Sequence, residues 1–112
     1  MKEDINLRIL ENAINRSVKE LNLSRQELNN LPPKIGQLKN LVRLDLSYNK
    51  LRYIPSEVFT LSELTHLDLL SNRIGYIPSE FKLLYKLTFL NLSGNIIKSL
   101  YSSIEQLINL TT

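Results

Sequence analysis

The residues that could carry out chemistry are few, and four of them suggest a hydrolytic site. The chain of 112 residues has one histidine, His66, with Asp68 close by and Asp45 and Ser47 in an earlier segment. Ser, His and Asp side chains that meet in space form the nucleophilic triad of many hydrolases. The chain has no cysteine, which excludes disulfides, thiolate metal sites and a cysteine nucleophile. Its three glycines lie far apart and do not make a phosphate-binding loop.

The elements that must position these side chains follow from an internal repeat. Residues 18–109 divide into four rows of 23, which read VKELNLSRQELNNLPPKIGQLKN, LVRLDLSYNKLRYIPSEVFTLSE, LTHLDLLSNRIGYIPSEFKLLYK and LTFLNLSGNIIKSLYSSIEQLIN. Positions 1, 4, 6, 11, 14, 18 and 21 are apolar in all four rows. A fixed period of this length is typical of a solenoid, in which each repeat forms one coil stacked on the next.

Three parts of each row predict three local structures. Alternating apolar residues at positions 4 and 6 indicate a strand whose positions 3, 5 and 7 face solvent, and successive strands should pair in parallel. Positions 14, 18 and 21 share one face of a helical turn, and proline at position 15 fits its first turn. The amide side chains at position 9 should bridge the backbones of neighbouring coils. They are Gln26, Asn49, Asn72 and Asn95.

Each row resembles LxxLxLxxNxLxxLPxxIxxLxx, the repeat of the leucine-rich repeat family in its 23-residue form. The resemblance covers residues 18–112, and the Leu-Pro or Ile-Pro pairs at positions 14 and 15 are similar to the subtype of Ras-group-related, Roco-type and bacterial intracellular proteins. It implies an α/β repeat solenoid, a right-handed arc with a parallel concave sheet and short convex helical turns. It also implies protein partners.

We expect three parts along the chain. Residues 1–17 should form an amphipathic N-terminal capping helix, with Ile5, Ile9 and Ala13 on one face, because a solenoid exposes its core at both ends. Residues 18–109 should form four repeats, and residues 110–112 should begin an incomplete fifth. The last coil then has little cover. We therefore expect either that the chain is a fragment of something longer or that this end binds a partner or a second copy of the chain.

The repeat separates the residues of the possible triad. Ser47 lies at position 7 of its row and His66 at position 3, which places them about 13 Å apart along the strand direction. His66 with Asp45 and Asp68 could form only an open, poorly enclosed ion site. The sequence therefore predicts no catalytic residue, no metal site and no cofactor, and hence a protein that is not an enzyme.

The outward side chains of the concave sheet are the remaining candidate site, because aromatic and arginine residues are common anchors of protein interfaces. We predict a partner-binding patch of eight residues: Arg43, Asp45, Tyr48, His66, Asp68, Leu70, Phe89 and Asn91. The partner would present a basic or hydrogen-bonding group to Asp45 and Asp68, and an apolar group to Leu70 and Phe89. The two carboxylates should also raise the pKa of His66.

Charge and hydropathy narrow the class of partner. The chain has 14 Lys and Arg against 11 Asp and Glu, with the two signs interspersed and no basic cluster, so we expect no nucleic acid partner. We find neither a signal peptide nor the ~18 apolar residues of a membrane span, so we expect a cytoplasmic protein that does not bind membranes. The alternative is the recognition arm of a larger enzyme, such as a Roco-type GTPase or a ubiquitin ligase, whose catalytic part is elsewhere.

Overall fold

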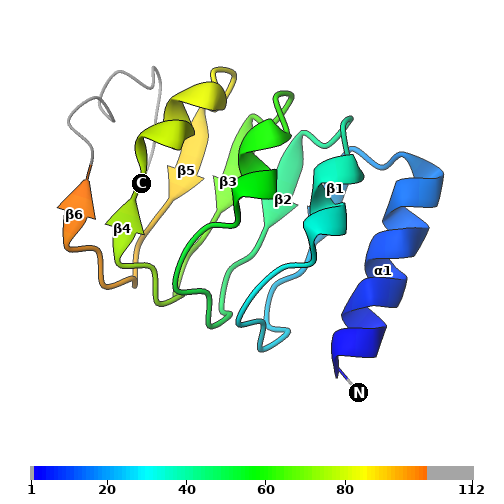
Figure 1. Cartoon of the computed structure of the whole chain (residues 1–112), viewed down its shortest axis with the longest axis horizontal. Coiled ribbons are helices and arrows are strands. Elements are labelled where there is room, and N and C mark those ends of the chain that lie inside the picture. Colours follow the sequence, from blue (N-terminus) through cyan, green and yellow to red (C-terminus); the bar gives the residue numbers. More distant parts are fainter. Residues whose placement is uncertain (1, 101–112) are drawn as a thin grey trace.

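A computed structural model describes residues 2–100, and it shows a solenoid of stacked coils (Figure 1). Helix α1 (Lys2–Arg16) lies at one end, and each following coil runs from a strand on the concave face to the convex side. The concave strands are β1 (Glu20–Asn22), β2 (Arg43–Asp45), β3 (His66–Asp68) and β5 (Phe89–Asn91). The α/β repeat solenoid predicted from the sequence is therefore the observed fold.

The four concave strands form one parallel sheet in the order β1-β2-β3-β5. Paired residues are 23 positions apart, so that Arg43 lies opposite His66 and Asp45 opposite Asp68. The middle residue of each strand is a leucine that is buried in the core: Leu21, Leu44, Leu67 and Leu90. The burial of these leucines fixes the register, because a slip of one residue would turn them all to solvent.

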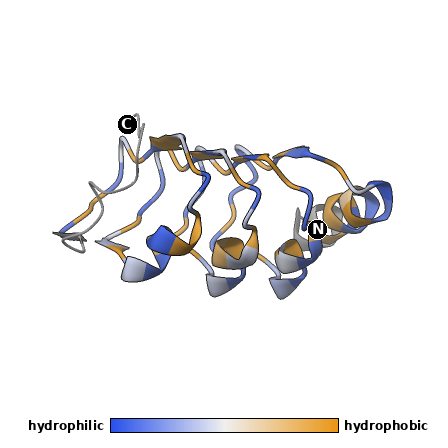
Figure 2. Ribbon diagram, turned by 90° about the horizontal axis from the view of Figure 1, so that it is seen from above, coloured by the Kyte–Doolittle hydropathy of each residue, from blue (hydrophilic) through white to orange (hydrophobic). Residues whose placement is uncertain are grey.

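The convex side carries three short 3₁₀ helices, as the spacing of positions 14, 18 and 21 predicts. They are η1 (Pro33–Gln37), η2 (Ser56–Thr60) and η3 (Ser79–Leu83). Seen from above in Figure 2, they form one layer and the concave strands form the other. Each buries the side chain at position 18 completely: Ile35, Val58 and Phe81. The sequence predicted the proline at position 15 inside the first turn of each helix, and this detail is wrong. The proline occupies the N-cap of each helix instead.

A second pair of parallel strands was not predicted. Strand β4 (Tyr76–Ile77) pairs with β6 (Ser99–Leu100), again with a separation of 23 residues. Figure 1 shows this pair at the end of the solenoid opposite helix α1. In stacked coils, equivalent backbone segments of neighbouring repeats run parallel to one another. Extended segments outside the concave sheet can therefore also pair when they come into register.

The asparagines at position 9 bridge neighbouring coils, as predicted. Asn72 accepts a hydrogen bond at Oδ1 from Leu51 N (3.1 Å) and donates from Nδ2 to Leu46 O (2.9 Å) and Leu69 O (3.2 Å). Asn49 and Asn95 repeat the arrangement one coil before and one coil after. We call these three residues the asparagine ladder. The side chain of Gln26, predicted to belong to the ladder, donates only to Ser24 O within its own coil, among the hydrogen bonds of the described residues. Its backbone N donates to Asn49 Oδ1 (3.0 Å).

Helix α1 lies against the first coil. Leu10 and Ala13 are buried in the same apolar core as the repeats, and Ile9 and Ile14 pack against it while remaining partly exposed. A capping role for this helix stays a prediction. The side chain of Ile5, the fifth row at residues 110–112 and the self-association expected near them lie outside the described residues.

Candidate binding surface on the concave sheet

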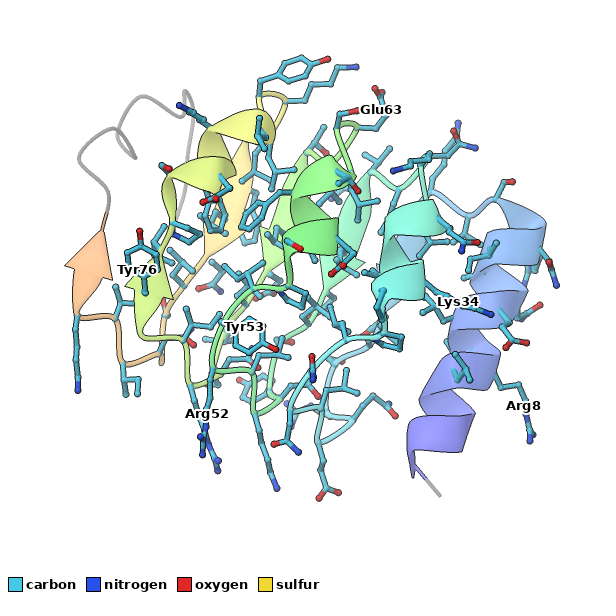
Figure 3. All side chains as sticks on the ribbon, viewed as in Figure 1. Arg8, Lys34, Arg52, Tyr53, Glu63 and Tyr76 are labelled. Atoms are coloured by element: carbon cyan, nitrogen blue, oxygen red, sulfur yellow. The ribbon has the colours of Figure 1, made fainter. Side chains whose placement is uncertain are left out.

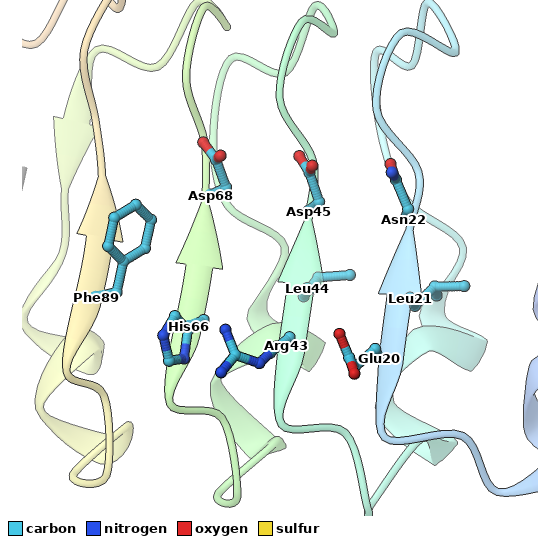
Figure 4. Close-up of a pocket in the computed structure, with 9 residues that line it drawn as sticks. All are labelled: Glu20, Leu21, Asn22, Arg43, Leu44, Asp45, His66, Asp68 and Phe89. Carbon is cyan, nitrogen blue, oxygen red and sulfur yellow. The ribbon is translucent and has the colours of Figure 1, made fainter.

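The concave sheet forms a shallow hollow of about 430 Å³ that is open to solvent (Figure 4). Nine residues of strands β1, β2, β3 and β5 line it: Glu20, Leu21, Asn22, Arg43, Leu44, Asp45, His66, Asp68 and Phe89. Five of the eight predicted patch residues are among them, and Tyr48, Leu70 and Asn91 are not. The prediction missed Glu20 and Asn22, although they occupy positions 3 and 5 of the first row. Including positions 3 and 5 of the first row in the predicted patch would have identified both residues.

The outward side chains of the four concave strands form two rows, and Figure 4 shows all of them except Asn91. The first row follows position 3 across the sheet: Glu20, Arg43, His66 and Phe89. The second row, which we call the concave Asx row, follows position 5: Asn22, Asp45, Asp68 and Asn91. Asp45 and Asp68 lie opposite each other on adjacent strands, so two carboxylates stand about one strand spacing, ~4.8 Å, apart.

Each carboxylate of the concave Asx row is held by the backbone that follows it. Asp45 Oδ1 accepts hydrogen bonds from Ser47 N (2.9 Å) and Ser47 Oγ (2.6 Å), and Asp68 Oδ1 accepts one from Leu70 N (3.0 Å). Within the described part of the chain, Oδ2 of neither aspartate forms a hydrogen bond. These turns fix the carboxylates and leave one acceptor oxygen on each for a ligand.

Ser47 does not face solvent as its position in the row predicts. Only 4% of its surface is exposed, because its hydroxyl turns back to Asp45. His66 Nδ1 forms its hydrogen bond with Thr65 Oγ1 (2.8 Å), so serine and histidine bond different partners. The structure therefore keeps the residues of the possible hydrolytic triad apart.

The pKa of His66 is lowered from its ordinary value of 6.5, and the predicted increase is wrong. Partial burial opposes the charged imidazole most, the nearby positive charge of Arg43 adds to this, and Glu20 acts in the opposite direction. The prediction counted the carboxylates of Asp45 and Asp68 as its main neighbours. Both are instead turned toward the strand ends, where backbone N–H groups bind them.

Three of the predicted patch residues make aromatic contacts. The rings of His66 and Phe89 stack with centroids 5.7 Å apart and an interplanar angle of 21°. The guanidinium of Arg25 lies 4.1 Å above the ring centroid of Tyr48, so one face of that exposed ring is covered by a cation. Arg25 was not among the predicted residues. It occupies the same column as Tyr48, one row earlier.

Leu70 and Asn91 border the hollow without lining it. Tyr48 N donates to Leu70 O (2.8 Å), which joins the two coils just beyond the strands. Asn91 lies opposite Asp68 in the sheet and accepts a hydrogen bond from Ser93 N (3.0 Å). Among the described residues, no three His, Asp or Glu side chains gather closely enough to hold a metal ion.

A stack of 23-residue coils with a parallel concave sheet, convex 3₁₀ turns and an asparagine ladder defines a repeat protein of the solenoid class. The chain belongs to the leucine-rich repeat family, whose repeat unit matches residues 16–74 and 39–97. No curated protein gives a significant sequence match. None of the helices in the described residues has the length and apolar character needed to cross a bilayer.

Two solved structures illustrate the similarity. A leucine-rich repeat protein of Leptospira interrogans is 36% identical over 90% of this chain, with a TM-score of 0.64. The leucine-rich repeat ectodomain of the receptor kinase SOBIR1 from Arabidopsis thaliana is 34% identical over 80%, with a TM-score of 0.65. The chain spans 32% of the first structure and 51% of the second.

Proposed function

We propose that this chain is a non-enzymatic interaction module that binds a segment of a protein partner on its concave sheet. The family to which it belongs generally mediates protein–protein interaction. The residues proposed for contact are Arg43, Asp45, Tyr48, His66, Asp68, Leu70, Phe89 and Asn91, with Glu20 and Asn22 at the border of the first coil. The observation that carries the proposal is the pair of fixed carboxylates, each with a free oxygen, in an open hollow.

The geometry favours a basic side chain in the partner. Asp45 and Asp68 lie in register on neighbouring strands, so one guanidinium or ammonium group can reach both free oxygens. Charge-assisted hydrogen bonds of this kind are about twice as strong as neutral ones. The stacked rings of His66 and Phe89 lie in the same hollow and provide an apolar surface beside the carboxylates. We therefore propose a segment in which a basic residue and an apolar residue are neighbours.

A selection from a displayed peptide library tests the proposal without a known partner. Peptides that bind the chain should be enriched in Arg or Lys next to an apolar residue. Their affinity should fall by about tenfold or more for the double variant Asp45→Asn/Asp68→Asn, which removes both charges but keeps each Oδ1 as an acceptor. Phe89→Ala should weaken the same peptides by a few fold.

The matched control is Glu57→Gln/Glu80→Gln, which removes two negative charges from the convex helices η2 and η3. This variant should bind the selected peptides as well as the unaltered chain does. If binding survives the loss of both aspartates, or if the convex control weakens it equally, the concave sheet is not the binding surface.

A second candidate function is that of a recognition arm in a larger enzyme. This candidate is favoured because the chain spans only about a third of the Leptospira structure and about half of the Arabidopsis structure. The second of these is the ectodomain of a receptor kinase. In that case catalysis, for example by a Roco-type GTPase or a ubiquitin ligase, would reside on another part of the polypeptide. The complete open reading frame decides the question: a catalytic domain in the same frame supports this candidate, and a frame with repeats alone contradicts it.

A further inference from the structure

The loops that leave the carboxyl ends of the concave strands carry an excess of positive charge. Residues 25–30, 48–53, 71–76 and 94–98 contain five bases and a single acid, Glu27, so they contribute +4 to a chain whose net charge is +3. The bases are Arg25, Lys50, Arg52, Arg73 and Lys98. Their spacing of about one repeat disperses them along the sequence. For this reason no basic cluster stands out in the linear sequence.

The backbone places these loops side by side. Arg73 N donates to Leu51 O (2.8 Å), the residue between Lys50 and Arg52, and Lys98 N donates to Gly75 O (2.9 Å) in the next loop. Glu27 forms an ion pair with Lys50 at 3.8 Å. Within the described part of the chain, the side chains of Arg52, Arg73 and Lys98 form no ion pair. We call this set of loops the basic edge.

Two exposed tyrosines adjoin the basic edge. Tyr53 follows Arg52, and Tyr76 occupies the same column in the next coil; 56% and 54% of their respective surfaces are exposed. Figure 3 shows Arg52 at the lower margin, with Tyr53 and Tyr76 above it on neighbouring coils. Both tyrosines line a hollow of about 260 Å³, whose other walls include Ile54, Phe59 and Pro78.

The opposite edge of the solenoid differs. Glu63, at the upper margin of Figure 3, lies 2.9 Å from Lys86, and this hydrogen-bonded pair raises the pKa of the lysine. This pair matches one cation with an acid, whereas Arg52, Arg73 and Lys98 of the basic edge have no acidic partner among the described residues. An anionic ligand gains most where the cations are not already paired.

We propose that the basic edge binds an acidic segment of a protein, with one aromatic or aliphatic side chain of that segment seated in the hollow between Tyr53 and Tyr76. The cations complement carboxylates, and the apolar walls at Ile54, Phe59 and Pro78 suit a side chain. Because Glu80 also lines the hollow, only an uncharged side chain suits it, and the carboxylates of the segment lie outside it on the cations. A protein segment is favoured over a nucleic acid because the family generally binds protein partners. This surface is separate from the concave hollow, whose proposed ligand has the opposite charge.

Fluorescence anisotropy with the full chain tests this inference. The probe is a labelled peptide of aspartate and glutamate with one central phenylalanine. Binding should weaken by about tenfold for Arg52→Glu/Arg73→Glu and by a few fold for Tyr76→Ala. The same peptide with serine in place of phenylalanine should bind more weakly, and added salt should weaken every complex. The concave variant Asp45→Asn/Asp68→Asn should retain binding, which separates this surface from the proposed function.

The matched control is Lys39→Glu/Lys82→Glu, which makes the same change in net charge away from the basic edge. It should change the affinity by less than about twofold, because surface charges at a distance are screened. Three results would overturn the proposal: failure of the acidic peptide to bind, equal weakening by the control variant, or tighter binding of an oligouridylate than of the peptide. Circular dichroism melts of all variants establish that each is folded.

Discussion

Two columns of Asn and Asp side chains cross the coils of this protein, and they differ in how far their hydrogen-bonding groups are used. In the asparagine ladder, Asn72 uses both its oxygen and its nitrogen, and only 6% of its surface is exposed. In the concave Asx row, Asp68 uses one carboxylate oxygen and presents the other to the hollow. Hydrogen-bond saturation, more than residue type, distinguishes a structural column from one that is free to bind.

A third column connects the other two. At position 8 every described coil has a positive φ: Arg25 (58°), Tyr48 (57°), Ser71 (55°) and Gly94 (72°). This left-handed residue turns the chain from the concave Asx row at position 5 into the ladder at position 9. Three of the four are not glycine, so the turn costs about 1 to 2 kcal/mol at each of them, and the ladder hydrogen bonds just beyond it help to offset that cost.

The largest expected effect is on the ladder itself. Asn72→Ala should lower the free energy of unfolding by about 2 to 4 kcal/mol, because it leaves Leu51 N without its acceptor in a buried site. The two carbonyls it releases keep one bond each, since Leu46 O also accepts from Asn49 and Leu69 O from Asn95. Urea denaturation measures the change.

The matched control for that substitution is Asn91→Ala, the same chemical change in the concave Asx row. It removes an exposed hydrogen bond from Ser93 N and should cost under about 1 kcal/mol. Equal destabilisation by the two variants would mean that the distinction between the columns is wrong.

The connecting column should show the next largest effect. Gly94→Ala forces a side chain into the left-handed region, and its Cβ would come within 2.8 Å of Ser71 Oγ and 3.2 Å of Ser71 Cα. We expect a loss of about 1 to 3 kcal/mol in the free energy of unfolding. Gly75→Ala is the control, because its nearest neighbour would be Ile96 O at 3.9 Å and its φ is not in this region. A loss no greater than that of the control would contradict the role given to this column.

Changes that keep the turns of the concave Asx row should cost little stability. Asp45→Asn/Asp68→Asn retains both Oδ1 acceptors and should shift the free energy of unfolding by under about 1 kcal/mol. Asp68→Lys also removes the acceptor for Leu70 N, so it should be the more destabilising of the two. Denaturation curves that rank them in the reverse order would show that the turn bonds are unimportant.

The smallest effect concerns protonation in the first row of the hollow. An NMR titration of His66, the only histidine, should give a pKa below 6.5. Arg43→Ala should raise this pKa and Glu20→Gln should lower it further, whereas Asp68→Asn should leave it nearly unchanged. A pKa above 6.5, or one that depends mainly on Asp68, would contradict this account. It would show that the aspartates raise the pKa of His66, as the sequence had predicted.

The same shift predicts a pH dependence of stability. With its pKa lowered, His66 binds fewer protons in the folded chain than in the unfolded chain below pH 6.5. The free energy of unfolding should therefore fall slightly as the pH drops from 6.5 through the lowered pKa, and the variant His66→Gln should lose this dependence. Because the imidazole is only partly buried, the effect is small.

Periodicity predicted the features that depend on backbone placement. The apolar columns gave the strands, the core leucines and the convex turns, and the Asn at position 9 gave the ladder, because buried backbone groups must be paired. The opposition of Asp45 and Asp68 in the sheet also followed from the period. Each of these features is set by the residue's position within the coil.

Side-chain direction could not be predicted in the same way. The carboxylates of Asp45 and Asp68 accept hydrogen bonds from the backbone that follows them. They therefore do not raise the pKa of His66, as their positions on the neighbouring strands had suggested. The basic edge escaped notice because its cations lie in different rows and gather only when the loops stack. The stacking of Arg25 on Tyr48 likewise joins two coils, and no local pattern marks it.

NMR mapping of a selected peptide on the isotopically labelled chain tests the central claim most directly. If the unsaturated column is the binding surface, the largest chemical-shift changes on titration should fall on Asp45, His66, Asp68 and Phe89, with the ladder asparagines less affected. Changes confined to the convex helices η1, η2 and η3, with strands β2 and β3 unperturbed, would contradict the assignment of the concave sheet as the recognition face.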